Sequence, residues 1–178
     1  MPRRTETLRR SPRRGLLASV VFVNGFATIA LLAVLAMVCR VPLVFPSVGP
    51  TAFLLFASPE TASACPRNTL CGHAIGILCG YGALCLMGLQ HAPSAMLEGV
   101  NLARVIAAAS SLAFTGALMI LFRVVHSPAG ATTLIISLGL ITDPLYLLAI
   151  GAAVALIVIQ ALVTHRLRGI PYPLWSPA

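Results

Sequence analysis

Four stretches of this chain stay apolar for about twenty residues or more, and this feature limits the possible folds most strictly. They are Leu16–Val38, Leu70–Leu89, Val100–Phe122 and Leu145–Thr164. A helix of about 20 apolar residues is long enough to cross the roughly 30 Å hydrocarbon core of a bilayer. Only 9% of the residues are charged, whereas a soluble domain carries about 25%. We therefore predict an all-α, polytopic membrane helix bundle whose first partner is the lipid bilayer.

Two shorter apolar segments, Val41–Ser58 and Pro128–Thr142, are interrupted by glycine and proline. Each stands between two long segments, and the two resemble each other, since Gly49-Pro50-Thr51 matches Gly130-Ala131-Thr132. The order long, short, long therefore occurs twice. We expect a duplicated unit, with four long spans and two short Gly/Pro-broken helices arranged as a 3+3 inverted repeat.

The distribution of arginine bears on the topology. If the short segments dip into the membrane and return, the chain has four spans, and Arg67 and Arg123 lie outside. If the short segments cross, the chain has six spans, and these two arginines fall on the same side as both termini, opposite Glu98 and Asp143. Cytoplasmic loops are enriched in Lys and Arg. We therefore favour six crossings of a bacterial-type inner (cytoplasmic) membrane, with both termini in the cytoplasm.

The N-terminal segment is strongly basic, with six of the twelve basic residues of the chain in its first fourteen positions. We interpret residues 1–15 as a cytoplasmic Arg-rich tail that sets the topology and attracts anionic headgroups, and we expect no nucleic-acid partner. The first apolar run exceeds the 7–15 residues or so of a signal-peptide core, so we expect it to be retained. Residues 16–165 then form the transmembrane domain, and residues 166–178 form a short C-terminal tail.

The two broken segments are the strongest indication of function. Broken backbone at membrane depth is tolerated inside protein or beside a water-filled cavity, and paired breaks in two halves are typical of a transporter's central site. Each break precedes a helical run, so unpaired N–H groups and the positive end of a helix dipole would face the bundle interior. Such a site suits a small inorganic anion. The alternative is that glycine and proline merely kink packed helices.

Several polar residues close to the breaks are candidates for this site, because polar groups are costly in a membrane and mark function by default. Arg67 either guides an anion or anchors the topology. His73 and His126 are either hydrogen-bonded structural histidines or carriers of a coupled proton. The full predicted substrate-binding set is Gly49, Thr51, Arg67, Asn68, His73, His126, Gly130 and Thr132.

Three glycines, Gly72, Gly76 and Gly80, recur at a spacing of four and would form one side-chain-free helix face. Such a face lets a second backbone approach closely, and we expect its partner inside the same bundle, although an oligomer is possible. Asn24 and Gln160 are lone polar residues in apolar helices, where interhelical hydrogen bonding is the commoner role.

Metal binding and catalysis find no support in the sequence. The five cysteines lack the spacing of a zinc site, so we expect no metal, no cofactor and no disulfide framework. The four carboxylates are scattered along the chain. We therefore predict no catalytic residues and no enzymatic activity.

The motifs around the two breaks resemble the HPP family of membrane proteins. The first is Gly49-Pro50-Thr51-Ala52-Phe53-Leu54-Leu55-Phe56 with the later Pro66-Arg67-Asn68 and Gly72-His73, and the second runs from His126 to Thr133. The family is named for His-Pro-Pro in the second motif, where this chain has Ser127 in the middle position, and Cys65 stands where glutamine is expected. The resemblance implies an integral membrane protein, and some relatives are associated with nitrite transport.

Two hypotheses follow. The first is a small-anion transporter or facilitator with nitrite as the leading substrate. The second is a non-transporting membrane scaffold or accessory subunit, in which the breaks are packing devices. A cavity shared by the helix starts at Gly49–Thr51 and Gly130–Thr132 is expected of a transporter and not of a scaffold.

Overall fold

The computed structural model describes residues 12–176, and every regular element within that range is helical. The four long helices are α1 (Pro12–Cys39), α3 (Pro66–Leu86), α5 (Leu102–Leu121) and α7 (Pro144–Leu167). The shorter ones are α2 (Val48–Ala57), α4 (Ala95–Glu98), α6 (Ala129–Ser137) and the 3₁₀ helix η1 (Ala62–Ala64). All four long helices are long and apolar enough to span a membrane. The predicted all-α membrane bundle is confirmed, and α4 was not anticipated. Most of the predicted Arg-rich tail lies outside the described residues.

Capping residues explain where three of the long helices begin. The Cys65 side chain accepts a bond from the Asn68 N–H at 3.4 Å, and Pro66 occupies the first turn of α3. Asn101 caps α5 at 2.9 Å, and Asp143 caps α7 at 2.8 Å. A cap satisfies an N–H group at the start of the helix that has no intrahelical partner. The prediction began the third segment at Leu70 because the polar residues before it resemble a loop, whereas they form the first turn of α3.

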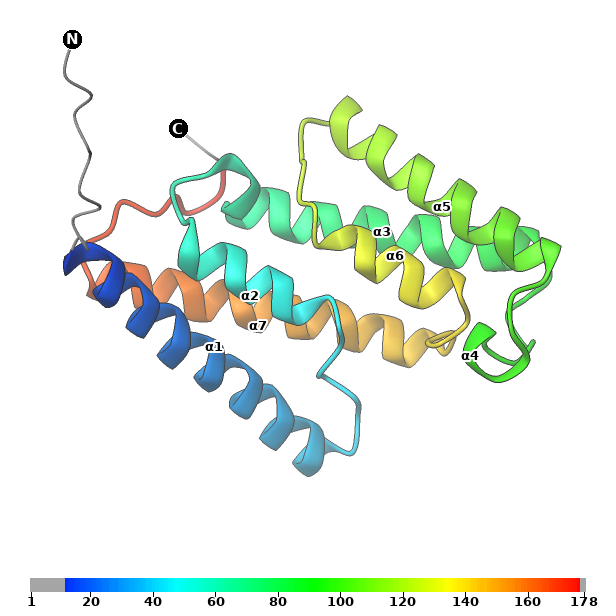
Figure 1. Ribbon diagram of the computed structural model, residues 1–178, viewed down its shortest axis with the longest axis horizontal. Helices are drawn as coiled ribbons and strands as arrows, with labels where there is room; N and C mark the ends of the chain where they lie inside the picture. Colours follow the sequence, from blue (N-terminus) through cyan, green and yellow to red (C-terminus); the bar gives the residue numbers. More distant parts are fainter. Residues whose placement is uncertain (1–11, 177–178) are drawn as a thin grey trace, which may run out of the picture.

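Each short helix is the second part of a longer segment. Non-helical chain leads from the end of α1 to Val48 and from the end of α5 to Ala129. Figure 1 shows that α2 and α6 both start near the middle of the bundle and run in opposite directions, α2 toward the end where α1 begins and α7 finishes. Each short helix therefore covers only part of the length of the bundle and is joined to the long helix before it by non-helical chain.

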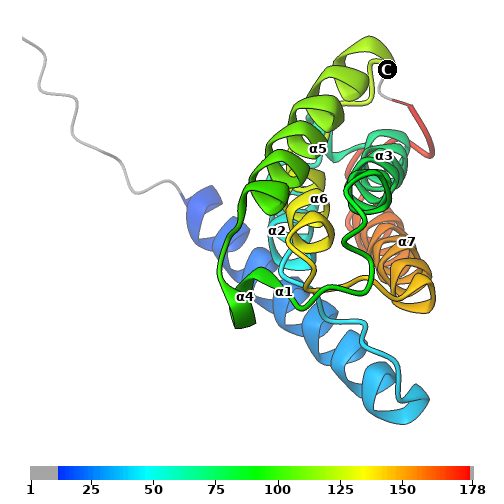
Figure 2. The ribbon, with the colours of Figure 1, turned by 90° about the vertical axis from the view of Figure 1, so that its right-hand side faces the viewer.

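The glycine face of α3 packs against α6, inside the bundle as predicted (Figure 2). A Cβ atom added to Gly76 would lie 2.8 Å from the Ala129 carbonyl oxygen, and one added to Gly80 would lie 2.8 Å from the Thr133 carbonyl oxygen. At Gly72 it would lie 2.8 Å from the His126 Cβ. These neighbours are largely backbone atoms, which cannot rotate away, so glycine is required for this helix contact.

Polar contacts join α1 to α7. The Thr28 hydroxyl lies 2.9 Å from Gln160 Oε1, the Gln160 amide donates to the Asn24 carbonyl at 3.3 Å, and Thr164 donates to Asn24 Oδ1 at 3.1 Å. The predicted interhelical role of Asn24 and Gln160 is confirmed. Figure 2 shows α1 at the margin of the bundle, and many large apolar side chains of α1 are exposed, as expected of a lipid-facing helix.

The residues after α7 fold back over the start of α3. The Tyr172 hydroxyl donates to the Ala64 carbonyl at 2.6 Å, and the Arg67 N–H donates to the Trp175 carbonyl at 3.0 Å. Burial raises the pKa of the Tyr172 phenol above its usual value, and the neighbouring Cys65 adds to the effect. The phenol therefore stays protonated and keeps its hydrogen bond at any physiological pH.

Substituting the central glycine of α3 tests the close helix contact. Gly76→Ala places a methyl group against the α6 backbone, and overpacking of this kind costs about 1–3 kcal/mol. We expect a lower thermal unfolding midpoint in detergent. Gly82→Ala is the matched control, because Gly82 lies on the same helix with open space around it. Equal midpoints for the two variants would contradict the packing described here.

Candidate functional site

His73 lies between the starts of the two short helices and bonds to both. Its Nε2 is 2.9 Å from the Thr51 hydroxyl of α2, and its Nδ1 is 2.8 Å from the Thr132 hydroxyl of α6. His73 is 1% exposed, and both threonines are fully buried. Three of the predicted site residues, separated widely in sequence, therefore form one buried cluster at the centre of the bundle.

Donor counting fixes the tautomer of His73. The single hydroxyl proton of Thr51 goes to the Ser47 carbonyl at 2.8 Å, so the Thr51 oxygen accepts from His73. His73 therefore carries its proton on Nε2, and its Nδ1 accepts from Thr132. Every hydrogen bond of this ring is then satisfied within the protein, which is the usual state of a buried polar group.

His126, in the loop before α6, joins the same cluster with the opposite tautomer. Its Nδ1 lies 2.7 Å from the Ser63 carbonyl, which can only accept, so the proton is on Nδ1. Its Nε2 is 3.4 Å from the Thr51 hydroxyl, whose proton is already donated to Ser47. The lone pair on Nε2 therefore has no good donor, although His126 is fully buried and its ring lies 5.1 Å from that of His73.

Arg67 and Asn68 lie at one end of the bundle, beside a surface pocket. The Arg67 guanidinium donates to the carbonyls of Phe122 and Arg123 at 3.3 and 3.5 Å, at the C-terminus of α5. This contact caps a helix end, where a positive charge is favourable. Asn68 donates to the Val125 carbonyl at 3.4 Å, while its buried Oδ1 has no partner among the described residues. The pocket has a volume of about 420 Å³ and is lined by Ala62, Ser63, Asn68, Ile120, Arg123 and Val125.

Gly49 and Gly130 do not join the cluster. Gly49 is exposed with open space beside its Cα, and a Cβ at Gly130 would meet Leu112 Cδ1 at 3.3 Å. The expectation that these glycines allow backbone to approach an anion is therefore not met. Both helix starts are tight, with the Thr hydroxyls turned to the interior and the glycines turned away from it.

The predicted arrangement of the helix starts also needs correction. The N–H groups of Ala129, Gly130 and Ala131 donate to the carbonyls of His126, Ser127 and Pro128 in a tight turn. They are not free donors, because the turn before α6 satisfies them locally. In addition, His73 occupies the space between Thr51 and Thr132, so the two helix starts share a side chain and not an open cavity.

Hydroxyl groups continue the polar interior away from the histidines. Thr133, next to Thr132 on α6, lies 2.9 Å from the Thr115 hydroxyl of α5, and Thr115 donates to the Ser111 carbonyl at 2.8 Å. Thr115 and Ser111 were not predicted. Thr115 and Ser111 are four residues apart and share one buried face of α5 with Arg104 and Ala107. This helical spacing could have indicated them from the sequence.

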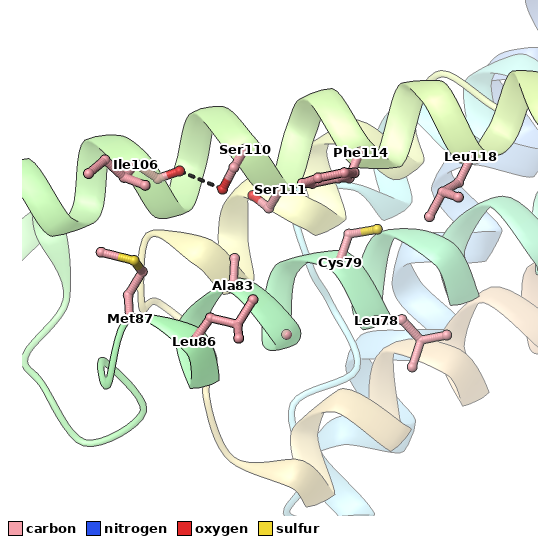
Figure 3. A pocket seen from close by; sticks show the side chains of 11 residues that line it. Leu78, Cys79, Ala83, Leu86, Met87, Ile106, Ser110, Ser111, Phe114 and Leu118 are labelled. Carbon is pink, nitrogen blue, oxygen red and sulfur yellow. Dashed lines mark hydrogen bonds between the residues drawn. The ribbon is translucent and has the colours of Figure 1, made fainter.

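A second hollow, between α3 and α5, is apolar (Figure 3). It has a volume of about 420 Å³ and is lined mainly by Leu, Ile, Met and Phe side chains, among them Leu78, Met87, Ile106 and Phe114. The hydroxyl of Ser110 in this groove is engaged with the Ile106 carbonyl at 2.6 Å, as Figure 3 shows. Ser111 also lines the groove, and its hydroxyl donates to the Ala108 carbonyl at 3.1 Å. The groove is therefore mainly a surface for hydrocarbon.

No metal centre accompanies these groups in the described part of the chain, where no three His, Cys, Asp or Glu side chains are placed to hold an ion.

The four long apolar helices, packed around a buried histidine–threonine centre, define a polytopic integral membrane protein. Residues 11–173 match the transmembrane region of the HPP family, so the chain belongs to that family. No curated protein and no solved structure matches it.

The tautomers assigned by donor counting are directly measurable. In ¹⁵N NMR spectra of histidine-labelled protein at neutral pH, we expect His73 to be protonated on Nε2 and His126 on Nδ1. His165 should resemble His73, since its Nε2 donates to the Leu55 carbonyl at 2.9 Å. The His126→Asn variant assigns the Nδ1-protonated signal. A spectrum in which the signal lost in this variant is Nε2-protonated would contradict the hydrogen-bond network.

Proposed function

We propose that this protein is a transporter or facilitator of small monovalent anions, with nitrite as the leading substrate. The observation that carries the proposal is a series of buried polar side chains through the bundle, which we term the polar track. In order from the surface pocket it consists of Asn68, His126, Thr51, His73, Thr132, Thr133, Thr115 and Ser111. Buried polar groups in a membrane domain are expensive and typically mark a substrate path.

The charge of the track suits an anion. The described carboxylates, Glu60, Glu98 and Asp143, are all exposed, so they do not place a negative charge along the track. Hydroxyl and imidazole groups can each turn a proton toward an anion. Because none of them carries a fixed positive charge, they would bind the ion weakly enough for it to leave, as conduction requires.

We also propose six membrane crossings built from two inverted halves. The non-glycine residues Arg40 and Arg123 both have φ 54° and follow the first long helix of each half. Gly88 and Gly169 both have φ 66° and follow the last long helix of each half. Matching left-handed residues at matching places, together with the opposite directions of α2 and α6, support a duplicated unit.

The orientation we propose follows from the arginines. Arg67 contacts the end of α5, and Trp175 beyond α7 contacts Arg67, so Arg67, Arg123, Arg166 and Arg168 gather at the end of the bundle where α1 begins. The positive-inside rule favours this end as the cytoplasmic one. Both termini would then face the cytoplasm, as in a bacterial inner membrane protein.

Transport through this structure requires His73 to move, because its side chain closes the track between the two short helices. A change of its side-chain rotamer would release Thr51 and Thr132 to a passing anion. His126, whose Nε2 lone pair has no good donor, is the group we propose for a coupled proton.

The second candidate is a non-transporting scaffold or accessory subunit, and one observation favours it. The centre of the bundle is closed, with His73, Thr51 and Thr132 at 1% exposure or less and bonded to one another. A cluster that only holds the two halves together would look the same. For neither candidate do we propose an enzymatic reaction.

Anion flux in proteoliposomes separates the two candidates. Purified protein should admit nitrite faster than empty vesicles do, and Thr132→Val should lower the rate by about tenfold, corresponding to a barrier raised by about 1.4 kcal/mol. Thr132→Val removes one hydroxyl at nearly constant shape. Thr164→Val is the matched control, because Thr164 lies in the α1–α7 contact away from the track. Absence of nitrite, nitrate and chloride flux from the folded wild-type protein would reject transport and leave the scaffold.

A further inference from the structure

Arg104, in the first turn of α5, is a buried charge that the track does not use. It is 2% exposed. Its Nη2 donates to the carbonyls of Ala92 and Pro93 at 3.2 and 2.7 Å, and its Nη1 donates to the Ser137 carbonyl at 3.3 Å. All three acceptors are neutral, and the carboxylates of the described chain are exposed. A buried guanidinium without an anionic partner is an expensive arrangement.

The fold makes room for this guanidinium at Gly139. A Cβ atom at Gly139 would lie 2.5 Å from Arg104 Nη2 and 2.8 Å from Cζ. Gly139 also has φ +78°, a conformation that side chains rarely adopt. The position of the charge is therefore set by the turn that ends α6.

Two N–H donors of the Arg104 guanidinium and the hydroxyl of a neighbouring serine have no hydrogen-bond partner within the described part of the chain. Arginine has five N–H donors, and three are used in the bonds just described, which leaves Nε–H and one Nη1–H without an acceptor among residues 12–176. The Ser137 hydroxyl, fully buried, also has no partner in this range. Ser137 thus has an unsatisfied hydroxyl and a carbonyl that accepts from a charge lacking a counter-ion, a combination that points to a missing anionic ligand.

We propose that Arg104 and Ser137 form a binding site for a small planar oxyanion, such as nitrite or formate. The inference rests on the proposed function, since this site would lie beyond Thr133, on the side of the track away from the surface pocket. Ser137 lies one helical turn beyond Thr133 on α6, so the site continues the track. The flat fork of a guanidinium matches two oxygens held in one plane, which gives a preference for oxyanions over chloride.

The site also suggests how its own access is controlled. Ala92 and Pro93 belong to the connection between α3 and α5, and they hold both Nη2 hydrogens. An oxyanion bound to Nε–H and the adjacent Nη2–H takes the place of one of these loop carbonyls. Anion binding would therefore loosen the connection from Arg104, and anion release would restore it.

The competing explanation is structural. Arg104 holds the α3–α5 connection against the C-terminus of α6, where a positive charge is favourable in any case. The two explanations differ over Ser137. In a purely structural arrangement the Ser137 hydroxyl has no ligand, so Ser137→Ala should not change the effect of nitrite on the unfolding midpoint. In an anion site the hydroxyl is a ligand.

The experiment measures thermal unfolding of the full-length protein in detergent with sodium nitrite, sodium formate or sodium chloride at equal ionic strength. We expect nitrite and formate to raise the unfolding midpoint and chloride to raise it less. Ser137→Ala should fold as well as the wild type and weaken apparent nitrite binding by about tenfold, as loss of a hydrogen bond to an ion does. Ser110→Ala is the matched control on α5, since the Ser110 hydroxyl bonds within its own helix.

Arg104→Lys keeps the charge without the fork and should reduce the preference for nitrite over chloride by about tenfold. If this variant fails to fold, the Ser137→Ala result alone decides. Nitrite protection that is unchanged in Ser137→Ala, or equal to chloride protection in the wild type, overturns the proposal. Nitrite protection that depends on Ser137, in a protein without anion flux, keeps the site and rejects transport. Anion flux together with nitrite protection that does not depend on Ser137 keeps transport and rejects the site.

Discussion

The close contact between α3 and α6 is the constraint on which the rest of the interior depends. The glycine face of α3 meets backbone atoms of α6 directly, so the two axes approach more closely than side chains would allow. At that separation the His73 ring reaches Thr132 on one side and Thr51 on the other. A wider spacing would leave the Thr132 hydroxyl and Nδ1 of His73 without each other in a hydrocarbon environment, which is costly. Packing and polar satisfaction therefore support each other at the centre of the bundle.

Charged side chains are arranged differently at the two ends of the bundle. At one end the arginines are exposed or cap a helix, and the surface pocket opens beside them. Away from that end the Arg104 guanidinium is buried among the carbonyls of Ala92, Pro93 and Ser137. Between them the interior carries hydroxyls and neutral imidazoles. If the two halves are a duplicated unit, as we propose, this asymmetry comes from their side chains and not from the helix architecture.

Much of the fold could be predicted because membrane thickness sets the length of apolar helices, and the glycine spacing of α3 indicated its buried face. Thr51, His73, His126 and Thr132 were also predicted, since polar residues near broken segments are few in this chain. The failures concern orientation. Which side of a tight helix start faces inward depends on the rotation of the helix about its axis, so Gly49 was placed inside although it is exposed. The turn bonds before α6, the bonds of His73 to both short helices and the burial of Arg104 likewise depend on contacts that are set only once the chain has folded.

The segment after α7 has a practical consequence. Tyr172 is inserted under the start of α3, and the Trp175 carbonyl holds the first turn of that helix. These residues cover the start of α3, where Asn68 and the preceding Ser63 line the surface pocket. A reporter protein joined directly to this end would compete with Tyr172 for its place and crowd the pocket. A long flexible spacer would leave Tyr172 and the pocket as they are in the structure.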